Sequence, residues 1–178
     1  LDPVLHNFAS WYSTWVPSDF DGALQARVLL QEAMPGFVQL QISKTAPVLQ
    51  AQFQGPNGAP PYAVDFGDLS EGQRALCALW VLRCAFVQGP RTVIFDEPDN
   101  YVALREIQPW LNEVIEEASR EGGPQVFLIS HHPELLDQLA VDHGVRFFRD
   151  GGPTRIEPFR GKAGLTASET VARGWIDG

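Results

Sequence analysis

Two short apolar runs, each followed by a polar cluster and separated by a helical pattern, constrain the fold of this chain most. Thr92–Phe95 is a compact β-branched run that ends at Asp96-Glu97-Pro98, and Gln125–Ile129 ends at Ser130-His131-His132. Between them, apolar residues recur at helical spacing over Leu104–Ala118. The order strand, helix, strand predicts parallel strands with a crossover helix, and such sheets bind ligands at the carboxyl ends of their strands. Both polar clusters lie at such ends.

The flanking segments predict a mixed α/β chain. Leu5–Trp15 has the apolar spacing of an amphipathic helix, and its aromatic face requires a partner surface. The alternation in Phe37–Ile42 and Val48–Phe53 predicts a β-hairpin with one solvated face, followed by a loop over Gly55–Pro61. Pro109 must either kink the helix over 104–118 or begin a new one. The other predicted elements are helices over Ala23–Ala33, Ser70–Val87 and Glu134–Ala140, and strands over Val145–Phe148 and Thr154–Phe159.

Composition excludes several classes of protein. The 178 residues are 44% hydrophobic, which suffices for a core. The formal charge of −9 and the pI near 4.8 argue against a generic binder of nucleic acid or anionic membranes. No apolar stretch reaches about 18 residues and no signal-peptide pattern is present, so we expect neither a membrane span nor an export signal. Cys77 and Cys84 lie about 10 Å apart along one predicted helix, which favours reduced, cytoplasmic thiols.

A third polar cluster, Leu69-Ser70-Glu71-Gly72-Gln73-Arg74, opens the predicted helix over 70–87. A hydroxyl and free backbone N–H groups at the positive end of a helix suit a phosphate. The equally weighted alternative is that Ser70 only caps the helix. The cluster alone leaves both interpretations open.

The acidic pair Asp96 and Glu97 suits phosphoryl transfer, because one carboxylate can hold Mg²⁺ through water while the next polarises the attacking water. The alternative is a surface pair that caps the next helix. We also considered a metal centre made of Asp96, Glu97, His131 and His132. Adjacent histidines lack the i, i+4 spacing of helical zinc motifs, and no further ligand cluster supports such a centre.

Together, in this order and spacing, the three clusters resemble the C-terminal half of an ABC-type ATPase head, nearest to the AAA family ATPases of the RecF, SMC and OLD-like branch. The resemblance covers roughly Asp65–Ala140. It implies an α/β fold: a partial P-loop NTPase with a parallel sheet and flanking helices, preceded by an antiparallel hairpin. Residues 1–64 would be the end of an inserted lid region, and residues 65–178 the C-terminal lobe.

The resemblance also implies a role for each cluster. Ser70, Gly72 and Gln73 would face the γ-phosphate of ATP held by a partner head. Asp96 would be the Walker B aspartate that holds Mg²⁺, Glu97 the catalytic base, and His131 the switch histidine. Asp99 and Asn100 occupy the place of the D-loop, which crosses the head-to-head interface, but the frequent Leu-His-Pro continuation is missing.

The phosphate-binding P-loop is absent from the sequence. Arg160-Gly161-Lys162-Ala163 lacks both the upstream glycine and the hydroxyl of that motif. We therefore expect the chain to begin inside or after the insertion, with the aromatic face of Leu5–Trp15 packed against something outside it. The expected partners are an N-terminal Walker A half of the same protein, a second copy of the head in a homodimer, and DNA only through regions outside this segment. ATP and Mg²⁺ are the expected cofactors, and the chain alone is predicted to be inactive.

Two other functions remain open at this point. One is a non-catalytic dimerisation or interaction module that keeps the head fold. The other is the nucleotide-binding subunit of a transporter, which Glu71, the preceding hairpin and the lack of a membrane-coupling signal disfavour. The sequence leaves open whether ATP drives DNA repair, chromosome maintenance or phage defence.

Overall fold

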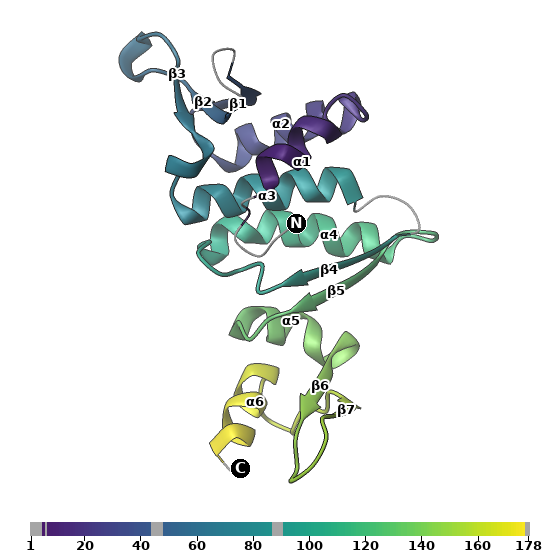
Figure 1. Ribbon diagram of the computed structural model, residues 1–178. Coiled ribbons are helices and arrows are strands. Elements are labelled where there is room, and N and C mark those ends of the chain that lie inside the picture. Colours follow the sequence, from purple (N-terminus) through teal and green to yellow (C-terminus); the bar gives the residue numbers. More distant parts are fainter. Residues whose placement is uncertain (1–4, 6, 44–47, 87–90, 177–178) are drawn as a thin grey trace. The chain divides into compact units, whose positions relative to one another are not determined.

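The structure is a computed structural model that describes residues 5, 7–43, 48–86 and 91–176 (Figure 1). The chain divides into two compact units, Leu1–Leu128 and Ile129–Gly178. The predicted boundary after residue 64 separates the end of an inserted lid region from the C-terminal lobe of the head, which is a different division from one into compact units. That boundary stays a prediction. No helix among the described residues is long and apolar enough to cross a bilayer.

The first unit contains helices, a three-stranded sheet and most of a two-stranded sheet. Its helices are α1 Phe8–Trp15, α2 Phe20–Ala33, α3 Glu71–Phe86 and α4 Leu104–Ser119, with short 3₁₀ turns at Pro56–Gly58 and Phe66–Asp68. Its strands are β1 Phe37–Ile42, β2 Leu49–Phe53, β3 Tyr62–Asp65, β4 Thr92–Asp96 and β5 Gln125–Ile129, whose last residue belongs to the second unit.

The predicted hairpin is present and extends into a sheet of order β1-β2-β3. β1 and β2 pair antiparallel, with Leu40 opposite Ala51, and β2 buries Leu49, Ala51 and Phe53 on one face. β3 follows the predicted loop and pairs antiparallel with β2. The sheet therefore has one buried face, as the alternation indicates.

The aromatic face of α1 packs inside the chain, so the expectation that it needs an outside partner is wrong. The ring of Phe8 stacks on Phe66 with centroids 4.9 Å apart, and Trp11 contacts Phe86 at the end of α3 at 5.5 Å. Phe8 is completely buried. The sequence could not show this, because Phe66 and Phe86 are distant along the chain.

α3 is buried on several sides, as its apolar pattern predicts, and α4 is joined to it by polar contacts. The indole N–H of Trp110 donates to the carbonyl of Leu79 at 2.9 Å. Arg83, only 4% exposed, donates to Glu113 at 2.6 Å and Glu117 at 3.4 Å. These bonds fix the register of the two helices. α4 continues through Pro109 as one helix, so Pro109 does not begin a new one.

Both cysteines are free and buried in α3, in agreement with the absence of a disulfide predicted from their spacing. Burial raises the pKa of Cys77 to about 12, because the thiolate would lose its hydration. The cytoplasmic location inferred from these thiols stays a prediction.

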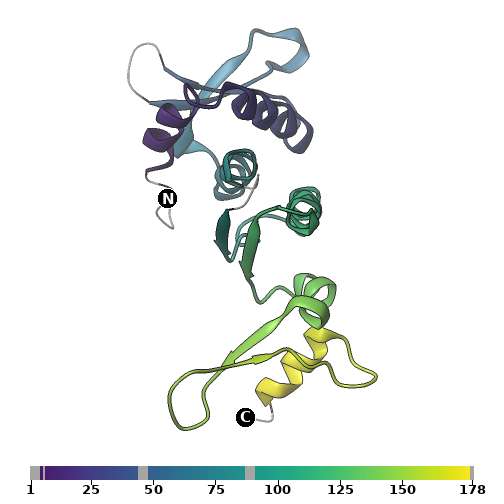
Figure 2. The same ribbon diagram turned by 90° about the vertical axis from the view of Figure 1, so that its right-hand side faces the viewer.

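β4 and β5 form the predicted parallel pair, with α4 as the crossover between them (Figure 1). The N–H of Gln125 donates to the carbonyl of Arg91 at 2.7 Å, where the pair begins. Within the first unit, α3 and α4 lie on the same side of these strands in Figures 1 and 2. The other side exposes Ile94 by 63% and Phe127 by 47%.

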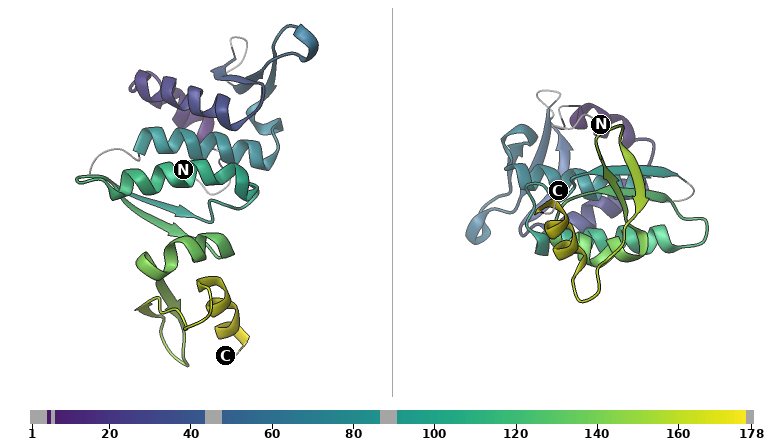
Figure 3. Two further views of the ribbon diagram at one scale, coloured as in Figure 1. Left: turned by 180° about the vertical axis from the view of Figure 1, so that it is seen from behind. Right: turned by 90° about the horizontal axis from the view of Figure 1, so that it is seen from below.

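The second unit contains α5 Pro133–His143, β6 Val145–Phe148, β7 Arg155–Pro158 and α6 Ala167–Ile176 (Figure 3). β6 and β7 form the predicted hairpin, with Phe147 opposite Ile156. The carboxylate of Asp137 on α5 accepts from the backbone N–H of Ser168 at 2.7 Å and from its hydroxyl at 3.0 Å. These bonds attach the start of α6 to α5. The sequence analysis did not predict α6.

Candidate functional site

The first part of the candidate site is the start of α3. The N–H of Gln73 donates to the Ser70 hydroxyl oxygen at 3.2 Å, and the N–H of Ser70 donates to Oε1 of Gln73 at 3.1 Å. This reciprocal pair is a capping box. Ser70 therefore caps the helix, as the structural interpretation of the motif requires. Among the described residues, none accepts a hydrogen bond from the Ser70 hydroxyl or from the Nε2 amide of Gln73. A phosphate contact by these two donors stays a prediction.

Gly72, the second residue of α3, lies against the backbone of Tyr101. A Cβ atom built at Gly72 would meet the carbonyl oxygen of Tyr101 at 2.6 Å, far inside van der Waals contact. The glycine is therefore required sterically, because a backbone oxygen cannot rotate away as a side chain can. This contact places the start of α3 directly beside the turn that follows β4.

That turn carries the acidic residues. Asp96 is the exposed last residue of β4, and one carboxylate oxygen of Glu97, Oε2, is buried. The N–H of Asn100 donates to the carbonyl of Glu97 at 3.1 Å, which closes the turn. Glu97 and Tyr101 have φ angles of +47° and +70°. Left-handed conformations cost non-glycine residues about 1–3 kcal/mol each and are concentrated at functional sites.

A pocket of about 620 Å³ joins these two parts of the site. Its polar lining comes from Ser70, Gln73 and Glu106, and its apolar lining includes Met34, Phe53 and Leu76, all at most 8% exposed. Tyr101, 73% exposed, stands at the same pocket. The sequence analysis missed Tyr101 and Glu106. No sequence pattern predicts a left-handed backbone conformation at a tyrosine, and a glutamate in the first turn of a helix, such as Glu106, is common in any protein.

The predicted switch histidine lies in the second unit. His131 is exposed between β5 and α5. Its neighbour His132 caps α5: Nδ1 accepts from the N–H of Glu134 at 3.3 Å, while the N–H of His132 donates to the Ser130 hydroxyl oxygen at 3.0 Å. A structural role for His132 is therefore clear. The place of His131 relative to Asp96 and Glu97 stays a prediction.

The alternative metal centre receives no support. Within the part of the chain that is described, no group of three or more His, Cys, Asp or Glu side chains is placed to hold a metal ion. Mg²⁺ is a different case, because it commonly takes only one or two carboxylates and completes its shell with water and substrate phosphates. A single exposed carboxylate at a strand end, as at Asp96, fits that kind of binding.

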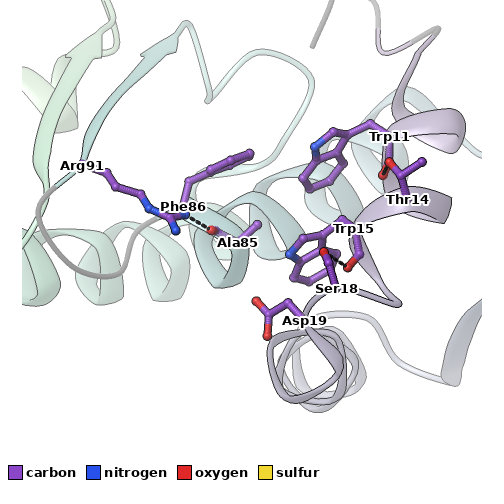
Figure 4. A pocket seen from close by; sticks show the side chains of 8 residues that line it. All are labelled: Trp11, Thr14, Trp15, Ser18, Asp19, Ala85, Phe86 and Arg91. Carbon is purple, nitrogen blue, oxygen red and sulfur yellow. Dashed lines mark hydrogen bonds between the residues drawn. The ribbon is translucent and has the colours of Figure 1, made fainter.

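A second pocket, of about 480 Å³, is lined by α1, the residues just before α2, the end of α3 and Arg91 (Figure 4). The indoles of Trp11 and Trp15 stack at 5.6 Å along it, and Arg91 donates to the carbonyl of Ala85 at 2.7 Å. None of the predicted site residues lines it. Its polar groups serve the helix ends: Asp19 accepts from the N–H of Gly22, and Arg91 binds a carbonyl in the last turn of α3.

Comparison with protein families gives a match over residues 60–137 to a family described as an AAA domain, putative AbiEii toxin, type IV toxin–antitoxin system. The match spans the start of α3, the turn after β4 and His131. No curated protein matches the sequence.

Two solved structures show the fold. One, from work on ATP-driven dimerization and DNA-stimulated activation of SMC ATPases, aligns with a TM-score of 0.60 at 14% identity over 93% of this chain and 95% of that chain. The other is an SMC head bound to the C-winged helix domain of ScpA, with a TM-score of 0.52 at 14% identity. This chain has the fold of an SMC-type ATPase head. The alignment with the second structure covers 82% of this chain and 45% of that chain.

The predicted fold class and the resemblance to ABC-type heads of the SMC and RecF-like branch are thereby confirmed. The ATPase-head similarity supports a nucleotide-binding, ATPase-like function in general terms. The roles of individual residues, the dimer and the pathway stay predictions.

Proposed function

We propose that this chain is the C-terminal lobe of an ABC-type ATPase that binds and hydrolyses ATP between two heads. The observation that carries the proposal is the close contact of Gly72 with the Tyr101 carbonyl. It sets the signature-like start of α3 beside the turn that follows the Walker B-like strand β4. A head that closes on a nucleotide needs both segments at one surface.

The start of α3 supplies donors for the γ-phosphate of ATP in the partner head. The free N–H groups of its first turn, the Ser70 hydroxyl hydrogen and Nε2 of Gln73 are all donors, and the helix dipole adds a positive potential. The exposed position of Ser70 leaves this end of α3 accessible to a second head.

The turn after β4 supplies the acidic groups. Asp96 would hold Mg²⁺ through water, and the ion when bound neutralises charge on the phosphates. Glu97 would accept the proton of the attacking water, and His131 would donate a hydrogen bond to the γ-phosphate. Asp99 and Asn100, in the same turn as Glu97, would face the second head.

A Walker A half of the same protein would cover the open side of β4 and β5. The Thr92 hydroxyl lies 3.3 Å from Oε1 of Gln125 across the strands. Strand alternation puts Ile94 and Phe127, two residues further on, on that same side, where both are exposed. Exposed apolar residues on a parallel sheet call for a covering layer, because such sheets are normally buried on both faces. Residues 65–178 would be the lobe and residues 1–64 the lead-in from an insertion.

The test compares ATP hydrolysis by the 178-residue chain with hydrolysis by a longer protein that includes a P-loop. We expect turnover only from the longer protein. In it, Glu97→Gln should abolish turnover and preserve ATP-dependent dimers, whereas Glu116→Gln, on the exposed side of α4, should leave turnover unchanged. Hydrolysis by the 178-residue chain, or full activity of Glu97→Gln, would contradict the proposal.

The second candidate is a non-catalytic dimerisation module with the same fold, and it is favoured by the capping box of Ser70 and Gln73, which gives the signature-like segment a structural role without a nucleotide. It predicts no turnover from the longer protein either. The same assay therefore separates the two candidates.

A further inference from the structure

Charge is distributed very unevenly along this acidic chain. Residues 145–162 contain five of the 13 Lys and Arg residues and two of the 22 Asp and Glu residues, so this segment carries a formal charge of +3 and the rest of the chain −12. The segment is the hairpin of β6 and β7 with the residues that follow it (Figures 1 and 2). We call it the basic hairpin. The acidic pI describes the whole chain and therefore does not reveal this basic segment.

The basic hairpin is a two-stranded ribbon with most of its length exposed. Every residue of β7 and all of β6 except Phe148 are exposed. Cross-strand pairs put Arg146, opposite Glu157, and Arg155, opposite Phe148, on one face. The N–H of Phe159 donates to the carbonyl of Gly144 at 2.8 Å, which extends the pairing beyond β7 toward Arg160.

Most of its positive charge is not neutralised by acidic partners. Arg146 lies 3.9 Å from Glu157, a long ion pair, and Nε of Arg149 donates to the neutral Thr154 hydroxyl at 3.2 Å. Among the described residues, the side chains of Arg155, Arg160 and Lys162 form neither ion pairs nor hydrogen bonds. Four of the five cations thus have no acidic partner, at positions spread from the tip of the ribbon to beyond its base.

We propose that the basic hairpin binds double-stranded DNA by lying in the major groove. A two-stranded ribbon fits the major groove of B-DNA, which is about 12 Å wide. Its cations meet the phosphates along the groove edges, which is the dominant source of affinity for DNA. This inference does not depend on the proposed ATPase, because the basic hairpin shares no residue with that site.

The shape of the groove and the face of the hairpin that carries the arginines favour DNA over other anionic partners. The deep, narrow major groove of A-form RNA does not admit such a ribbon. A membrane would have to take up the apolar residues Val145, Phe147 and Ile156, but these lie on the face opposite Arg146 and Arg155. A hairpin inserted by its apolar face would point those two arginines away from the headgroups.

The test measures binding of the purified 178-residue chain to a fluorescent 20-base-pair DNA duplex by anisotropy at several NaCl concentrations. Four phosphate contacts predict a slope of log K against log[NaCl] of about −3.6, which is roughly a 100-fold loss of affinity from 50 to 200 mM. Arg155→Gln with Arg160→Gln should weaken binding at least tenfold and reduce the slope by about 1.8.

The matched control is Arg105→Gln with Arg173→Gln, which removes the same charge from two exposed arginines outside the hairpin. It should change affinity less than twofold. Equal effects of the two double variants, or no binding of the duplex at 50 mM NaCl, would overturn the proposal. So would equally tight binding of duplex RNA, of poly-glutamate or of vesicles containing phosphatidylserine, because each would identify another partner class. Circular dichroism of both variants excludes a folding defect as the cause.

Discussion

Gly72→Ala is the most direct test of the contact that organises the candidate site. The added methyl would lie 2.6 Å from the carbonyl oxygen of Tyr101, whereas ordinary contacts of a Cβ begin near 3.4 Å. The two segments must therefore separate by about 0.8 Å. The obstacle is backbone in a turn already constrained by left-handed residues at Glu97 and Tyr101, so relaxation is difficult.

The expected loss of stability follows from two opposing effects. Alanine in place of a helical glycine normally stabilises by about 1 kcal/mol. Overpacking against an unyielding neighbour costs about 1–3 kcal/mol. We expect the free energy of unfolding to fall by about 1 kcal/mol. A helical Gly→Ala change without a clash would raise it by about 1 kcal/mol, so the two cases differ by about 2 kcal/mol.

Urea unfolding followed by tryptophan fluorescence measures this loss, because four of the five tryptophans lie in the first unit. The control is Gly67→Ala in the same unit, where an added Cβ meets nothing within 4 Å and φ is not left-handed. Its stability should change by less than about 0.5 kcal/mol. If Gly72→Ala were as stable as Gly67→Ala, or more stable than the wild type, the steric reasoning would be refuted.

The remaining predictions concern the capping box, the contact of α3 with α4, and the buried thiol. Gln73→Glu keeps the capping acceptor, so urea stability should be unchanged, while the added negative charge should weaken ATP-dependent dimers of a longer protein seen by gel filtration. Arg83→Ala should cost about 2 kcal/mol in urea unfolding because it removes the buried partner of Glu113 and one of the two arginine partners of Glu117, and a much smaller loss is expected for the exposed Arg120→Ala. Trp110→Phe should cost about 1–2 kcal/mol, because the buried hydrogen bond from the indole N–H to the Leu79 carbonyl is lost. The pKa of Cys77, raised to about 12 in the folded state, means that only the unfolded thiol ionises above about pH 9; stability should fall from there toward pH 12, and native protein should react slowly with a thiol reagent at pH 8.

The elements that the sequence predicted well have a strong local pattern. The bounds of β1, β5 and β6 agree with prediction, because each is a short apolar or alternating run bounded by turn residues. β3 was missed because three of its four residues are exposed, and it follows two prolines that mark a loop. It becomes a strand only because β2 offers a free edge.

In the candidate site, too, the local features were predictable from the sequence and the long-range contact was not. The residue types at Ser70, Asp96 and Glu97 were visible, since each carries chemistry at the end of a predicted element. The contact between Gly72 and Tyr101 was not, because it joins residues 29 positions apart through a backbone shape that tyrosine rarely adopts. The sequence pattern predicts which residues lie at the ends of helices and strands. Which of these residues are in contact depends on long-range packing of the backbone.

This packing also changes how variants of the signature-like segment should be interpreted. Ser70 and Gln73 hold each other in the capping box, and Gly72 is needed against Tyr101, so the segment has a structural reason for three of its residues even without a nucleotide. Loss of activity in Gly72→Ala would therefore not demonstrate a phosphate contact, because the turn after β4 would be displaced as well. Gln73→Glu separates the two roles, since it preserves the cap but removes the Nε2 donor and adds a negative charge where an incoming phosphate would lie. A nucleotide role for the start of α3 thus depends on a variant that keeps the local structure intact.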